Sequence, residues 1–160
     1  MKNAMRYRLK LATWTVVREP GEPSPRKLTT SEAVARLALD FVRAADDDRE
    51  HFWAVLLDGK NRYRMHYEVS IGSQSASIVH PREVLGPAVR EGAAAFVIAH
   101  NHPSGDPTPS FEDIEVTERL LKCGDLLGIR LLDHVIVANG TENWASFVDR
   151  GLLEQGGRSK

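Results

Sequence analysis

Two histidines separated by one residue, in His100-Asn101-His102-Pro103, form the segment with the clearest capacity for chemistry. On an extended backbone, side chains at positions i and i+2 point to the same face, so both imidazoles can reach one metal ion. On a helix, the same spacing would splay them apart. The apolar run Ala94–Ala99 just before them predicts such a strand. The histidines are therefore expected at the C-terminal end of a buried strand, where α/β sheets often place ligand sites.

A carboxylate follows the histidines in the first turn of a predicted helix. The loop from His100 to Pro109 is rich in Pro and Gly, and Ser110 opens a helix whose first turn includes Asp113. Two imidazoles and one carboxylate can hold zinc and leave a fourth position for water. Ser110 and Asp113 also have the pattern of a helix cap, and the two roles do not exclude each other. Asp106 and Glu112 are nearby carboxylates that could compete with Asp113.

Helices and strands alternate along the chain, which predicts an α/β sandwich with a mixed sheet. A strand at Tyr7–Leu11 and a Pro-rich loop at Glu19–Pro25 come first. The expected elements after them are a helix from Thr30 or Ser31 to about Ala45, a buried strand Phe52–Leu57, a turn Asp58–Asn61, a strand Arg62–Ile71, a helix from Pro81 to near Gly92, a strand Ala93–Ala99, a helix from Ser110 to about Leu127, a strand Ile129–Ala138 and a short helix Phe147–Leu153.

Composition restricts the classes of protein that fit. The chain has 160 residues, which is the size of one domain, and 42% hydrophobic with 27% charged residues is typical of a globular fold. A net charge of -1 argues against a module that binds nucleic acid by neutralising phosphates. The single cysteine, Cys123, excludes an internal disulfide and a Cys-rich zinc cage, and it fits a reducing cytoplasm. We expect no signal peptide and no membrane span.

The metal segment resembles a known motif over its whole length. His-x-His-Pro, six residues (Ser104–Pro109) and then Ser110-x-x-Asp113 match the JAMM motif of JAB/MPN domains. The segments Val79–Glu83, His100–Gly105 and Leu132–Ile136 are similar to the RadC family of bacterial proteins. The resemblance covers roughly Thr29 to Leu153.

This resemblance implies a fold and a domain organisation. The fold would be the cytidine-deaminase-like three-layer sandwich, with a mixed β-sheet flanked by helices. Residues 1–160 would form a single RadC-like JAB/MPN domain, with an N-terminal strand and Pro-rich loop at 1–28 and the core at 29–160. RadC proteins usually carry an additional helix-hairpin-helix region, which we do not find in this sequence. That departure weakens the link of the family to DNA repair for this chain.

The resemblance also implies a site and an activity. His100, His102 and Asp113 would hold one zinc ion per chain, Glu50 would act as acid and base, and the Ser110 hydroxyl would stabilise an oxyanion. The implied activity is that of a zinc-dependent metallopeptidase, which cleaves peptide or isopeptide bonds of a peptide or protein substrate with a metal-activated water. Sequence chemistry alone could not choose Glu50 over Glu68, Glu83 or Glu91.

Three other functions are weighed against this one. A cytidine-deaminase-type enzyme needs His-x-Glu and a Pro-Cys-x-x-Cys pair, and His102 and the lone Cys123 contradict that pattern. A RadC-type DNA-repair accessory protein and a non-catalytic MPN interaction module stay open. An exposed strand edge could pair two chains into a homodimer, and another divalent metal could replace zinc.

The remaining histidines receive other interpretations. His134 is interpreted as a core histidine, His80 as a strand end or helix cap, and His66 as a surface residue of a strand. His51 is expected to point away from Glu50, because neighbouring residues of a strand face opposite sides.

Overall fold

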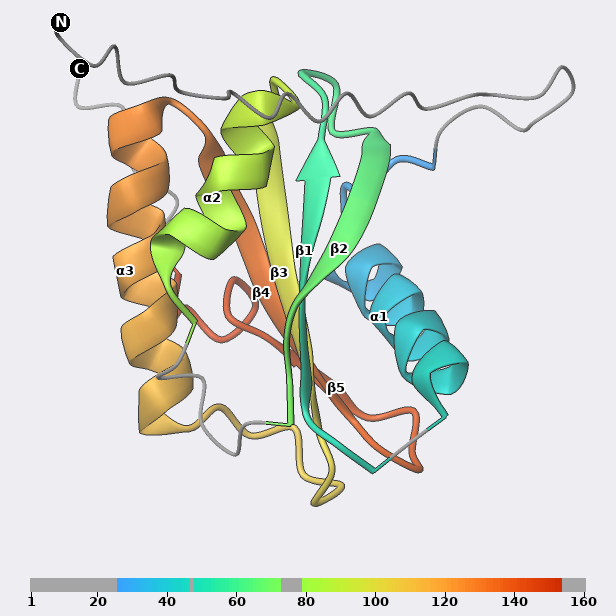
Figure 1. Cartoon of the computed structure of the whole chain (residues 1–160). Helices are drawn as coiled ribbons and strands as arrows, with labels where there is room; N and C mark the ends of the chain where they lie inside the picture. Colours follow the sequence, from blue (N-terminus) through green and yellow to red (C-terminus); the bar gives the residue numbers. More distant parts are fainter. Residues whose placement is uncertain (1–25, 47, 73–78, 154–160) are drawn as a thin grey trace, which may run out of the picture.

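The described residues form a five-stranded mixed β-sheet at the centre of the molecule, in the order β2-β1-β3-β4-β5. The computed structural model describes residues 26–46, 48–72 and 79–153. The strands are β1 (His51–Leu57), β2 (Tyr63–Ile71), β3 (Ala95–His102), β4 (Arg130–Ala138) and β5 (Trp144–Ser146). β3 and β4 are parallel, whereas the other neighbouring pairs are antiparallel (Figure 1). The predicted N-terminal strand Tyr7–Leu11 lies outside the described residues.

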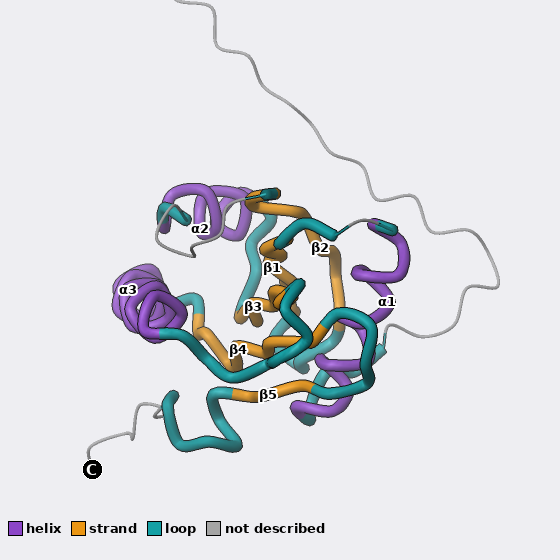
Figure 2. The backbone as a smooth tube through the Cα atoms, turned by 90° about the horizontal axis from the view of Figure 1, so that it is seen from below, coloured by secondary structure: helices purple, strands orange, loops and turns teal. Residues whose placement is uncertain are grey.

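Helices cover both faces of the sheet. The helix α1 (Ser31–Ala45) packs on one face against β3 and β4, and α2 (Pro81–Arg90) and α3 (Phe111–Leu127) lie together on the other. Figure 2 shows the same three layers from below, with the strands between α1 and the pair α2 and α3. The predicted α/β class, with a mixed sheet between helices, is therefore confirmed. In the described part of the chain, every helix is too short or too polar to cross a bilayer.

The two central strands are buried on both faces, as predicted for Phe52–Leu57. Their side chains alternate between two apolar clusters. Phe52, Ala54, Leu56, Phe96 and Ile98 pack toward α2 and α3, whereas Val55, Leu57, Ala95, Val97 and Ala99 pack toward α1. Continuing this alternation along β3 places His100 and His102 on the side of α3 and Asn101 on the side of α1.

Gly124 allows α3 to lie close to the sheet. A Cβ atom at this position would be 2.5 Å from the carbonyl oxygen of Ile129 and 3.1 Å from the ring of Phe96. Any larger residue would therefore push the helix away from β3 and from the start of β4. The helix ends at Gly128, whose φ of 70° is in the left-handed region that glycine adopts without steric cost.

The end of one predicted strand and the type of one predicted element are wrong. β3 does not end at Ala99 but continues to His102, because β4 pairs with it up to the partners His102 and Ala138. The segment Phe147–Leu153 forms turns and not the predicted helix. The carboxylate of Asp133 binds the amide of Val148 at 3.2 Å, which anchors these turns. The sequence reading also missed β5, since three residues are too few to show an alternating pattern.

Candidate metal centre

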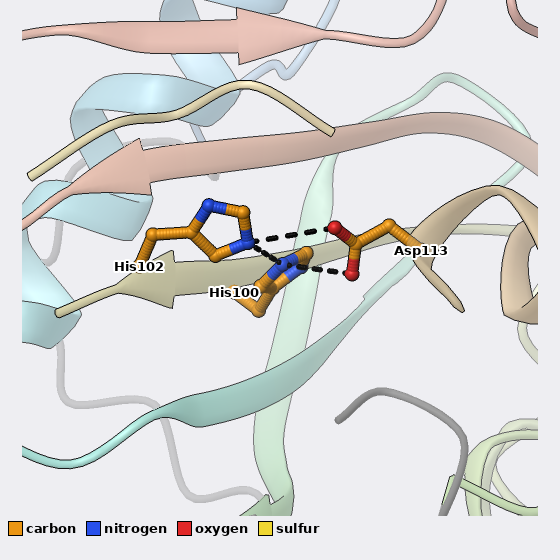
Figure 3. A group of neighbouring side chains, drawn as sticks. All are labelled: His100, His102 and Asp113. Atoms are coloured by element: carbon orange, nitrogen blue, oxygen red, sulfur yellow. Dashed lines mark hydrogen bonds and ion pairs between the residues drawn. The ribbon is translucent and has the colours of Figure 1, made fainter. Parts of the chain in front are cut away.

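His100, His102 and Asp113 meet at the C-terminal end of β3, with Asp113 reaching in from the first turn of α3 (Figure 3). The two Nε2 atoms are 2.9 Å apart, and His100 Nε2 lies 3.2 Å from Asp113 Oδ1. His102 Nε2 lies 3.4 Å from Asp113 Oδ2. In a tetrahedral zinc site with bonds of about 2.0 Å, two ligand atoms are separated by about 3.3 Å. The contacting atoms are thus about as far apart as two ligands of one zinc ion, with each histidine facing a different oxygen of Asp113.

The cluster has the donors of a metal site and is partly exposed on one side. One donor atom from each of the three residues lies within 4.8 Å of the others. His100 and Asp113 are buried, whereas the His102 side chain is 17% exposed and marks the open side. Nitrogen and carboxylate donors suit zinc and related divalent metals. Asp106 and Glu112 are exposed and lie outside this group.

Ser110 and Asp113 form a reciprocal cap at the start of α3. Ser110 Oγ accepts a hydrogen bond from the Asp113 amide at 3.1 Å, and Asp113 Oδ2 accepts from the Ser110 amide at 2.7 Å. The Ser110 hydroxyl also donates to Asp113 Oδ2 at 2.7 Å. The cap thus fixes the carboxylate toward the histidines, so Asp113 belongs both to the predicted helix cap and to the cluster.

Charges in the cluster favour an ionised carboxylate. Burial by itself would raise the pKa of Asp113, but the adjacent His100 and His102 rings and the Ser110 hydroxyl outweigh burial and hold this pKa far below its usual range. Burial opposes protonation of His102, yet the Asp113 carboxylate and the Asp106 carbonyl raise its pKa. His102 Nδ1 lies 2.7 Å from that carbonyl oxygen, which can only accept, so Nδ1 is the donor. Its Nε2 therefore remains the atom that could bind a cation.

Glu50 lies beside this cluster. β1 and β3 pair with Phe52 opposite His100, so extending the antiparallel register by two residues places Glu50 opposite His102. Glu50 is half-buried, and its carboxylate interacts electrostatically with the three clustered side chains. Burial raises the pKa of Glu50, the two histidines lower it and Asp113 raises it, with a net increase.

The other glutamates that sequence chemistry left open have different surroundings. Glu68 pairs with His51. Glu83 caps α2 by accepting from the His80 amide at 3.3 Å, and Glu91 ends the same helix. Of these four glutamates, Glu50 is the one that the structure brings to the cluster.

Asn101, which the sequence reading did not single out, holds the backbone on both sides of Glu50. Its side chain is buried, with Oδ1 accepting from the His51 amide at 2.7 Å and Nδ2 donating to the Arg49 carbonyl at 2.9 Å. Nδ2 also donates to Asn139 Oδ1 at 2.8 Å. Asn101 therefore links the start of β1 to the end of β3. The signal in the sequence was an amide residue between the two histidines, which the alternation of a buried strand places on the opposite face.

The other histidines have surroundings that can be compared with the predictions made for them. His134 is fully buried, and burial lowers its pKa well below the usual value. It lies outside the metal cluster but contacts His100, with 2.8 Å between His134 Nε2 and His100 Nδ1. His80 caps α2, and His66 stacks on Phe41 with ring centroids 4.0 Å apart. His51 is 4% exposed and binds Glu68.

Comparison with known proteins gives consistent matches. A model of the RadC-like JAB domain matches residues 28–152. A UPF0758 protein of Geotalea uraniireducens is 56% identical over 108 residues, which are 68% of this chain and 46% of that protein. A UPF0758 protein of Syntrophotalea carbinolica is 50% identical over 136 residues, which are 85% of this chain and 58% of that protein. The chain spans about half the length of the curated relatives it matches.

Proposed function

The chain belongs to the RadC-like JAB domain family, and from this premise we propose that it is a zinc-dependent hydrolase of peptide or isopeptide bonds. The site would hold one zinc ion per chain through His100, His102 and Asp113. The substrate would be a peptide or protein. The observation that carries this proposal is the convergence of the three side chains, whose contacting atoms are 2.9 to 3.4 Å apart, with Glu50 beside them.

Glu50 is the proposed acid and base. Zinc held by these three residues would polarise water and lower its pKa to about 7. The Glu50 carboxylate accepts the proton of the attacking water and later returns it to the leaving amine. Its raised pKa suits this double role, because a carboxyl that titrates closer to neutrality both accepts and releases a proton readily.

Ser110 is the proposed donor to the oxyanion of the substrate. Its hydroxyl donates to Asp113 Oδ2 and lies at the N-terminus of α3, where the helix dipole favours negative charge. Rotation of this hydroxyl toward a substrate would add one hydrogen bond to the developing charge. The Ser110 amide would keep its bond to Asp113 meanwhile, so the carboxylate would stay in place.

The experiment compares wild-type protein with Glu50→Gln after both are loaded with zinc. Each is incubated with a peptide library and with isopeptide-linked peptides, and new termini are identified by mass spectrometry. The variant should lose about 10²–10⁴-fold in turnover, which is the usual contribution of general acid-base catalysis. Its zinc content should equal that of the wild type, because Glu50 is not among the three proposed ligands.

Glu91→Gln is the matched control. It makes the same chemical change at the end of α2, away from the cluster, and should keep wild-type turnover. Undiminished turnover in the zinc-loaded Glu50→Gln protein would reject the role of Glu50. Zinc binding with no hydrolysis of any substrate by the wild type would favour the alternative of a non-catalytic interaction module.

A further inference from the structure

A buried row of polar groups connects α3 to His100 behind the metal centre. Thr117 lies one helical turn after Asp113, on the same face of α3. Its Oγ1 is 2.5 Å from the main-chain carbonyl oxygen of Asp113. Two acceptor oxygens at that distance would repel each other, so the hydroxyl proton must point to the carbonyl. Thr117 therefore has only its lone pairs left for the next member of the row.

The next member is His134 on β4. Its Nδ1 lies 2.6 Å from Thr117 Oγ1 and must donate, because the only proton of that hydroxyl is already used. The ring is fully buried, stacked on Phe147 with centroids 4.4 Å apart. An apolar environment of this kind disfavours the charged imidazolium. A neutral ring with a proton on Nδ1 has a free lone pair on Nε2.

His100 is the last member of the row. His134 Nε2 is 2.8 Å from His100 Nδ1, and as a lone pair it requires a proton there. We propose that Thr117 and His134 are positioning residues, which fix His100 as the tautomer protonated at Nδ1 with its Nε2 lone pair directed into the metal centre. This inference rests on the proposed function only in that a cation would bind at Nε2.

The two clustered histidines reach the same arrangement by different routes. His102 donates from Nδ1 directly to the carbonyl of Asp106. His100 is buried, and its Nδ1 faces Nε2 of His134. That nitrogen can accept a hydrogen bond because Thr117 holds the His134 proton on Nδ1. The helix that supplies Asp113 therefore also sets the tautomer of His100, through a residue four positions further along.

Correlation NMR of the imidazole nitrogens reads the tautomers directly. In chelator-treated wild-type protein, His100 and His134 should both carry a proton on Nδ1, whether or not His100 also carries one on Nε2. In zinc-loaded protein, His134 should keep that tautomer, since the row does not involve its Nε2 as a donor. A proton on Nε2 of His134 in either sample would overturn the inference, whether or not the protein hydrolyses anything.

Two variants of Thr117 separate the hydroxyl from the shape of the side chain. Thr117→Val removes the hydroxyl and keeps the branched shape, whereas Thr117→Ser keeps the hydroxyl. The valine variant should show mixed tautomers at His134 and bind zinc about 10–100-fold more weakly, as for loss of an outer partner of a ligand. The serine variant should stay within about threefold of wild type in the same chelator competition.

The outcomes also separate this inference from the proposed function. Equal zinc affinity and equal tautomers in the two Thr117 variants would contradict the positioning role of Thr117 and His134. If Thr117→Val does not fold, the wild-type tautomers decide alone, because they need no substitution. A wild-type protein with the expected tautomers that binds no zinc would contradict the proposed function and support this positioning role.

Discussion

On β3, the side chains that face α3 and those that face α1 both change from apolar to polar toward the end of the strand. On the α3 side, the polar residues are His100 and His102, whose Nε2 atoms point at a carboxylate. On the α1 side, the polar residue is Asn101, whose side chain binds backbone on both sides of Glu50. One face thus presents the candidate ligands, and the other fixes the neighbouring strand that carries the candidate base.

Adjacent residues of one strand would thus serve the proposed metal binding and the proposed catalysis separately. Removing a polar side chain on the α3 face should abolish the proposed metal binding, because the donors themselves lie there. A loss on the α1 face should leave the donors in place and displace Glu50. Substitutions on either face should therefore lower turnover, but only those on the α3 face should also lower zinc content.

His102→Ala breaks the α3 face and should have the largest effect. It removes one of three donors, so zinc affinity should fall by more than the roughly 10–100-fold cost of losing an outer partner. Hydrolysis should disappear with the metal. Zinc content of protein purified without added metal is the measurement, and His66→Ala on β2 is the control. Stoichiometric zinc in His102→Ala would overturn the assignment of this ligand.

Asn101→Ala removes the polar side chain on the α1 face of β3. The Arg49 carbonyl and the His51 amide lose their partner, and a displacement of Glu50 by about 1 Å could cost roughly 10²-fold in turnover. Zinc affinity should stay within about threefold of wild type, because no proposed ligand is touched. Asn143→Ala, at an exposed position, is the control. A parallel loss of zinc and turnover would show that the two faces are not separable.

Gly124→Ala tests the packing of α3 on the apolar part of the same face of β3. The new Cβ would lie 2.5 Å from the Ile129 carbonyl oxygen, and overpacking of this kind costs about 1–3 kcal/mol of unfolding free energy. Gly86→Ala, in α2, is the matched control, since no heavy atom of the described residues lies within 4 Å of that Cβ. The control should be stabilised by up to about 1 kcal/mol through helix propensity. Urea unfolding measures both, and destabilisation by both alike would contradict the steric argument.

Asp58, in the turn between β1 and β2, gives the smallest expected effect. A hydrogen bond from the Arg62 amide, with others from Lys60 and the Arg62 side chain, lowers the pKa of Asp58 to about 2 from 3.8. A lowered folded-state pKa stabilises the fold above the unfolded value, and this contribution is lost as the pH falls from about 4 to about 2. Carboxyl NMR titration should show the low pKa, and Asp58→Asn should remove that part of the pH dependence. A normal pKa at this residue would contradict the contacts of the turn.

Local sequence was sufficient for the features that depend on neighbouring residues. The spacing of His100 and His102, and the cap formed by Ser110 and Asp113, belong to one strand end and one helix start. Periodicity over single elements likewise predicted the helices and most of the strands. These features need no knowledge of which strands pair.

Features that depend on tertiary contacts could not be predicted in the same way. The residues by themselves did not separate Glu50 from the other glutamates; the resemblance pointed to it, and the register between β1 and β3 places it beside the cluster. The contact between Thr117 and His134 requires α3 to pack on β4. The pattern that predicted a helix at Phe147–Leu153 was overridden by the buried carboxylate of Asp133, which binds the Val148 amide.

The cap of α3 would link the lifetime of a bound ion to local opening of the helix start. Because the side chain of Asp113 both satisfies the amide at the helix start and faces the two imidazoles, fraying of the first turn withdraws an oxygen from the cluster. Amide hydrogen exchange at Asp113 and Ile114 should accordingly slow when zinc is added. The release rate of the ion should then follow the opening rate of that single turn.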